Sequence, residues 1–247
     1  MRLELPDDVQ PSDLDPAMRA QLRSLPESIA DNVARHLVVA DRVFADDPEK
    51  GYKYATAARD IASRVSAVRA FCGLAAYRTG RWTEALAELR AARRMSGEET
   101  FLPLMADAER GLGRPERALD LARSPEAEKL DREERIELRI VESGARRDLG
   151  QYDAAVVALQ IPELKDAQRR PWTARLYYAY ADALLEAGRE DEARLWFARA
   201  AEADRDRETD AAERFAQLEG TEWYDIEGDD FEILDAETST ETGAEKE

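Results

Sequence analysis

The side chains that most often act in catalysis are scarce in this sequence. Its 247 residues include one histidine, His36, and one cysteine, Cys72. A lone histidine and a lone cysteine form neither a transition-metal cluster nor a disulfide. We expect His36 to be a partly exposed helical residue. Cys72 lies next to Gly73 in a run of small residues, so we expect a buried structural thiol rather than a nucleophile.

Carboxylates are abundant but are not arranged for catalysis. The pairs Asp46/Asp47 and Asp229/Asp230 lie in a turn and in an acidic terminal stretch, so neither has the rigid opposed geometry that carboxylate catalysis needs. The sequence has no glycine-rich phosphate loop, no nucleophile elbow, no histidine-based triad and no zinc motif. We therefore expect no enzymatic activity, no metal and no cofactor.

Charge is distributed unevenly along the chain. The formal net charge is -18, and residues 219–247 alone carry twelve acidic residues against one lysine. The stretch from Arg59 to Arg94 has the opposite sign, with eight arginines and three acidic residues. Arginine forms planar pairs with carboxylate or phosphate, which makes this stretch a candidate contact surface. A GC-rich coding sequence would give the same arginine bias without any function.

The elements that must position these charges are predicted to be helices. Low glycine and proline counts with 44% hydrophobic residues favour an all-helical protein. The clearest pattern is Tyr177 to Asp204, where two apolar-periodic runs flank Gly188. Apolar residues recur three and four positions apart on both sides, which predicts a helix, a tight turn and a second helix. The facing stripes are Tyr177, Ala181 and Leu184 on the first helix and Ala193, Phe197 and Ala200 on the second.

Turn glycines repeat along the chain at 80, 113, 150 and 188, with intervals of 33, 37 and 38 residues. With small residues on both helices, this spacing resembles the tetratricopeptide repeat (TPR), a helical hairpin of about 34 residues. The resemblance implies an all-α solenoid of stacked antiparallel hairpins, in the manner of a bacterial-type TPR protein. The alternative is an irregular helical bundle.

The expected organisation follows from the repeat spacing. Residues 1–25 form an N-terminal arm and a short helix, residues 26–218 the repeat domain, and residues 219–247 a disordered acidic tail. The repeat units are 28–63, 66–97, 99–124, 131–162 and 174–206, followed by a capping helix at 209–218. The tail contains aromatic groups between carboxylates, at Trp223, Tyr224 and Phe231, a composition typical of segments that fold on binding.

The resemblance also implies where a ligand would bind. In stacked repeats the first helix of each hairpin lines the concave face. The family's groove positions correspond here to Leu74, Tyr77, Arg78, Asp107, Arg110, Arg147, Tyr178 and Asp182. Arginines in three successive units could hold an acidic extended peptide, with the tyrosines offering flat contact area. Alternatively, the arginines pair with neighbouring helix carboxylates such as Glu109 and Asp148.

One subclass of the family binds chaperone tails through a carboxylate clamp of lysine and asparagine. The matching positions here hold Ala70 and Leu74, or Pro103 and Asp107, so a clamp of that kind is not expected.

Three functions are compatible with this fold. The first is a cytoplasmic adaptor that binds a protein segment, with its own acidic tail as a second contact or an internal ligand. The second is an RNA- or ribosome-associated factor that uses the Arg59 to Arg94 stretch, which the overall acidity disfavours. The third is an oligomeric structural protein. No apolar run is long enough for a membrane span, so we expect no membrane partner.

Overall fold

The computed structural model describes residues 3–166 and 168–220, and the regular elements within these ranges are all helical. The α-helices are α1 (Pro16–Gln21), α2 (Glu27–Val43), α3 (Pro48–Ile61), α4 (Ser66–Arg78), α5 (Trp82–Ser96), α6 (Leu102–Gly111), α7 (Pro115–Ala122), α8 (Arg132–Asp148), α9 (Tyr152–Ala158), α10 (Thr173–Glu186), α11 (Glu190–Ala203) and α12 (Ala211–Glu219). The all-helical prediction is confirmed.

Consecutive helices pair as hairpins, and four of the hairpins share one turn. Gly80, Gly113, Gly150 and Gly188 each have φ between 69° and 75°, a left-handed conformation that glycine adopts without strain. The residue after each glycine donates its N–H to a carbonyl five positions earlier, for example Arg81 to Ala76 at 2.8 Å and Arg189 to Leu184 at 2.9 Å. This hydrogen bond closes the end of the first helix and turns the chain into the second.

Small residues let the helices of a hairpin approach closely. Ala181 on α10 and Ala193 and Ala200 on α11 are completely buried, and Phe197 and Leu184 fill the remaining space between the two helices. In the hairpin of α4 and α5, a Cβ atom at Gly73 would lie 2.8 Å from Cγ of Leu89. The predicted facing stripes are therefore the packed faces.

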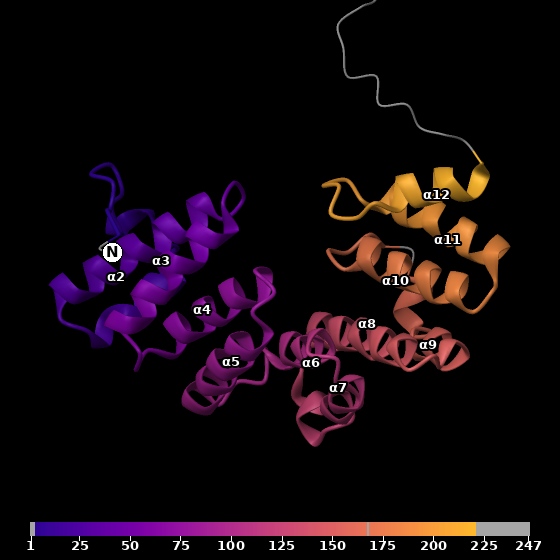
Figure 1. Ribbon diagram of the computed structural model, residues 1–247, viewed down its shortest axis with the longest axis horizontal. Helices are drawn as coiled ribbons and strands as arrows, with labels where there is room; N and C mark the ends of the chain where they lie inside the picture. The colour runs from indigo at the N-terminus through magenta and orange to yellow at the C-terminus, as the bar shows by residue number, and fades with distance from the viewer. Residues whose placement is uncertain (1–2, 167, 221–247) are drawn as a thin grey trace, which may run out of the picture.

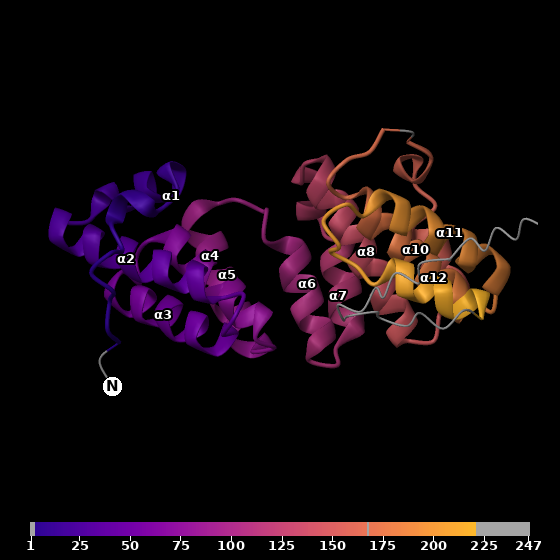
Figure 2. The same cartoon turned by 90° about the horizontal axis from the view of Figure 1, so that it is seen from above.

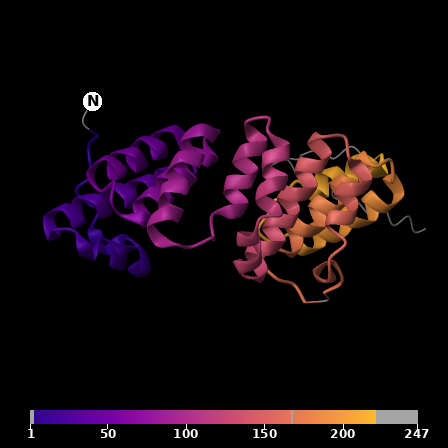
Figure 3. The ribbon, with the colours of Figure 1, turned by 90° about the horizontal axis from the view of Figure 1, so that it is seen from below.

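The stacked hairpins form an arc (Figure 1). Helices α4, α6, α8 and α10 lie on its inner side, and α5, α7 and α9 lie on its outer side. Seen from above, α6 and α7 lie between α1–α5 at one end and α8–α12 at the other (Figure 2). The linker from α5 to α6 is visible from below (Figure 3), and α12 packs on α11 as an end cap.

In the part of the chain that the structure describes, buried apolar residues form four clusters along the stack rather than one central core. The first joins the N-terminal arm to α2, α3 and α4. The smallest consists of Leu86, Leu89, Met105 and Ala108, at the junction of α5 and α6. Each cluster is built from elements that are neighbours in sequence, as expected for a repeat architecture.

Three details differ from the sequence expectations or refine them. The N-terminal arm is docked on α2, because Arg35 donates hydrogen bonds to the carbonyls of Val9 (2.9 Å) and Pro6 (2.8 Å). His36 is buried, with 8% exposure, and its Nδ1 lies 2.8 Å from the carbonyl of Asn32, so the expected partial exposure was wrong. Cys72 is buried as expected, and burial raises the pKa of its thiol.

The C-terminal helix α12 extends to Glu219, which pairs with Arg194 of α11. The expected disorder of the acidic tail, its docking on the arginine-rich stretch and its aromatic motif at Trp223, Tyr224 and Phe231 concern residues 221–247, outside the described residues.

Candidate binding groove

An apolar cavity of about 530 Å³ lies between α1, α4, α5 and the start of α6. Its walls include Ala70, Phe71 and Leu74 of α4 and Met18 of α1, and Glu98 is the single charged residue among the described ones that line it. Leu74 was among the groove residues predicted from the sequence, and the structure places it here. This cavity presents hydrocarbon surface to any ligand that enters it.

A second cavity of about 520 Å³ lies between α4, α6 and α8. Its apolar lining includes Pro103 and Leu104 of α6 and Ile140 and Val141 of α8. Its polar lining is mainly acidic, with one arginine, Arg110, against five carboxylates: Asp107, Asp131, Glu133, Glu134 and Glu137.

The two cavities share Leu104 as a lining residue. The first is lined by α1, α4, α5 and the start of α6, and the second by α4, α6 and α8, so α4 and α6 contribute to both. We name them together the inner groove, with an apolar half at α4 and an acidic half at α8.

A chain of polar contacts crosses the inner helices from α4 to α8. The Tyr77 hydroxyl donates to Asp107, which also accepts from Nη1 of Arg110 at 2.8 Å. Arg110 then donates Nε and Nη2 to the two carboxylate oxygens of Asp148, at 2.8 and 3.2 Å. Burial and the charge of Asp107 raise the pKa of Tyr77, so this hydroxyl remains a donor at neutral pH.

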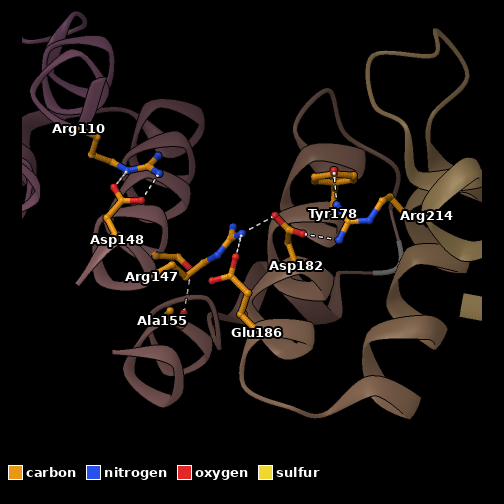
Figure 4. A network of polar contacts seen from close by, with 9 residues as sticks. Arg110, Arg147, Asp148, Ala155, Tyr178, Asp182, Glu186 and Arg214 are labelled. Carbon is orange, nitrogen blue, oxygen red and sulfur yellow. Dashed lines mark hydrogen bonds and ion pairs between the residues drawn. The ribbon is translucent and has the colours of Figure 1, made fainter. Parts of the chain in front are cut away.

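The contacts continue from α8 to α10 and α12 (Figure 4). Nη2 of Arg147 lies 2.7 Å from Asp182 and 2.6 Å from Glu186, both on α10. Asp182 also accepts from Nη2 of Arg214 on α12 at 3.0 Å. Burial alone would lower the pKa of Arg147, but its hydrogen bond to Glu186 and the charge of Asp182 outweigh burial and raise it.

Tyr178 lies at the C-terminal end of this chain of contacts. Its hydroxyl accepts from Nη1 of Arg214 at 3.3 Å, and its ring packs edge-on against Phe197. Burial and the hydrogen bond with Asp210 raise the pKa of Tyr178 to about 12.

The sequence-predicted groove residues therefore fall into two groups. Leu74, Tyr77, Asp107 and Arg110 line the inner groove. The guanidinium of Arg78 stacks over the Phe44 ring at 5.3 Å, and Arg147, Tyr178 and Asp182 take part in contacts between α8, α10 and α12.

Two of the three arginines in the expected ligand-binding row already have carboxylate partners within the chain. Arg110 and Arg147 already pair with carboxylates of the next repeat, so the alternative interpretation applies to both. Of the two carboxylates named for it, Asp148 pairs with Arg110, whereas Glu109 pairs with Arg90 and Arg114.

Most arginines of the Arg59 to Arg94 stretch are similarly engaged. Glu88 forms ion pairs with two of them, Arg59 and Arg69. Three more, Arg81, Arg90 and Arg93, pair with other carboxylates. In the described part of the chain, the exposed arginines of this stretch without an ion pair are Arg64, Arg78 and Arg94, and Arg78 is held on Phe44. The stretch therefore offers few free cations to a phosphate backbone.

Sequence reasoning missed Glu133, Glu137 and Leu104 as groove residues. On α8, Glu133 lies about two helical turns before Ile140, and Glu137 lies about one turn before it. Helical periodicity places all three on the groove face of α8, so the spacing could have identified them.

No helix in the ranges 3–166 and 168–220 is both long and apolar enough to cross a membrane. Within the same ranges, no three histidine, cysteine, aspartate or glutamate side chains gather in a way that could hold a metal ion.

No model of a known protein family matches this sequence, and no curated protein matches it either. Solved structures do. The crystal structure of TTC0263, a thermophilic TPR protein of Thermus thermophilus, is similar with a TM-score of 0.59 and 20% sequence identity, over 75% of this chain and 98% of that one. NprR, crystallised in complex with its cognate peptide NprX, is similar with a TM-score of 0.58 and 16% identity, over 83% of this chain and 66% of that one. The fold is a TPR-like α-solenoid, which confirms the sequence prediction.

Proposed function

We propose that this protein is a non-enzymatic adaptor that binds an extended segment of another protein in the inner groove. The observation that carries the proposal is the groove itself, two cavities of about 520 and 530 Å³ that share Leu104. Together they are large enough for several side chains of a ligand. The similar structure of NprR was crystallised with a peptide, which supports a peptide ligand for this fold.

Protein is favoured over RNA as the ligand. Five of the eight arginines in the basic stretch are neutralised by carboxylates, and the groove contains more acidic than basic groups. A phosphate backbone needs several free cations along one face.

A selection of random peptides on the immobilised full-length chain tests the proposal. Selected peptides are expected to bind the native protein and to lose at least tenfold in affinity with Leu104→Arg or Ala70→Arg, which place a long charged side chain in the groove. Fluorescence anisotropy measures the affinity, and circular dichroism checks that each variant retains its helices.

The matched control is Leu195→Arg on α11, where the leucine is 56% exposed and lines neither half of the groove. Its affinity should equal that of the native chain. If no peptide is selected, or if the groove variants bind as well as the control, the groove is not the binding site.

A further inference from the structure

We infer that the ligand segment has two blocks, apolar residues at one end and lysine or arginine residues at the other, with the basic block lying against α8. This inference rests on the proposed function, since it names the chemistry of the segment that the inner groove binds.

The apolar block is dictated by the half of the groove at α4. Ala70, Phe71 and Leu74 form its wall, and Glu98 is the single charged side chain that the described residues contribute there. A charged ligand side chain in this half would lose its hydration and gain little in return, whereas aliphatic or aromatic groups would bury hydrocarbon against hydrocarbon.

The basic block is dictated by uncompensated carboxylates in the other half. Asp107 is paired with Arg110, and Glu137 with Arg175. Asp131 and Glu134 accept backbone N–H groups in the capping box of α8, and among the described residues no cation lies within ion-pair distance of either. Glu133 is exposed and, in the same part of the chain, forms no ion pair. Three negative charges thus face this half without a cation within ion-pair distance, although Arg175 is near enough for the charge of Glu133 to raise its pKa.

An acidic ligand is excluded by the same geometry. Arg110 is held by Asp107 on one side and by both oxygens of Asp148 on the other. To bind a ligand carboxylate, Arg110 would have to break its bidentate pair with Asp148, which is as strong as the pair that it would form with the ligand. The acidic C-terminal stretch of residues 221–247 would therefore be repelled from this half rather than drawn into it.

The probes that test this are three synthetic peptides of equal length. One carries a block of leucine and valine followed by a block of lysines, the second has glutamates in place of the lysines, and the third has the composition of the first with the lysines interspersed. Each surface charge pair contributes roughly a two- to fivefold gain in affinity. The two-block lysine peptide is therefore expected to bind the full-length chain at least tenfold tighter than the glutamate peptide, and severalfold tighter than the interspersed one.

Two protein variants locate the effect. Glu133→Lys should weaken binding of the two-block lysine peptide about tenfold and reduce its dependence on salt. Glu190→Lys is the matched control, since Glu190 is also an exposed first-turn glutamate without a described ion pair, on α11 and away from both cavities. Its affinity should change less than twofold.

Three results would overturn the inference: equal or tighter binding of the glutamate peptide, equal binding of the interspersed peptide, or equal losses in the two lysine variants. If the glutamate or interspersed peptide still loses affinity with Ala70→Arg, the inner groove binds peptides and only the ligand chemistry is wrong. If no probe or selected peptide responds to Ala70→Arg, the proposed function fails as well.

Discussion

At the scale of single residues, the close approach of α4 and α5 depends on Gly73. A Cβ atom there would lie 2.8 Å from Cγ of Leu89 and 3.2 Å from its backbone nitrogen, so Gly73→Ala must push α5 away from α4. Alanine favours helix by about 1 kcal/mol over glycine, but overpacking costs typically about 1–3 kcal/mol. We expect a net loss of about 1 kcal/mol in the free energy of unfolding, measured by urea denaturation.

Gly144→Ala is the comparison for that variant. Its Cβ would meet the guanidinium of Arg110 rather than the backbone of a neighbouring helix, so the pairs of Arg110 with Asp107 and Asp148 would shift while the helices keep their distance. The stability of Gly144→Ala should therefore exceed that of Gly73→Ala. The reverse order would show that the approach of α4 and α5 is not tight.

The buried residues could be foreseen more fully than the polar partners, of which Asp148 was named only as one of two alternatives. The stripes containing Ala181, Ala193 and Phe197 follow directly from helical periodicity, because packing faces recur every three or four residues. Arg110 finds Asp148 38 residues away, on the next repeat. That pairing depends on the angle between hairpins and on rotamers, which local sequence does not encode. The acidic half of the groove is different, since the spacing of Glu133, Glu137 and Ile140 on α8 could have identified it.

At the scale of elements, Arg147 links α8 to α10. Its side chain is 21% exposed and that of Asp182 is 16% exposed, whereas the pair Arg189 and Glu192 on α11 has 39% and 51% exposure. Water screens the second pair more strongly. A double-mutant cycle with Arg147→Ala and Asp182→Asn should give a coupling energy of about 1 kcal/mol, against about 0.3 kcal/mol for Arg189 and Glu192. Equal couplings would mean that burial adds nothing to the link between the helices.

The contact of Arg147 with Glu186 on α10 predicts that the stability of the protein depends on pH. The hydrogen bond from Arg147 holds the pKa of Glu186 below its ordinary value of 4.5. A carboxylate with a lowered pKa in the folded state stabilises the protein above its unfolded pKa and loses this effect as pH falls through the folded value. Glu186→Gln should therefore lower the melting temperature at pH 7, and the difference should disappear below the lowered pKa. A difference that persists unchanged at about pH 2 would contradict this assignment.

Helix ends were more predictable than helix lengths. The turn glycines placed the hairpin turns correctly, and a capping box of Asp131 and Glu134 begins α8. The second helices of two units are short, α7 with eight residues and α9 with seven, because the chain turns into 3-10 segments that begin at Pro125 and Pro162. A proline marks such a break in the sequence, but its effect on the stacking angle depends on the neighbouring repeats.

At the scale of the whole molecule, charge should govern how fast a ligand arrives. Residues 221–247 carry eleven acidic residues and one lysine, the same sign as the acidic half of the groove. Removing them should slow association of the two-block lysine peptide at low salt, because long-range attraction raises encounter rates. Stopped-flow fluorescence at low and high salt measures this, and the difference should vanish at high salt. Tighter binding after removal would instead indicate an inhibitory tail.

The division of the buried apolar residues into four clusters bears on how the chain is made. All buried members of the first cluster lie between Val9 and Ala75. They can therefore come together on the ribosome as soon as that length has emerged, before α6 has left the exit tunnel. Domains fold as units from the N-terminus during synthesis, and each later hairpin then has a finished surface to dock on. The order of translation and the order of packing coincide along the solenoid.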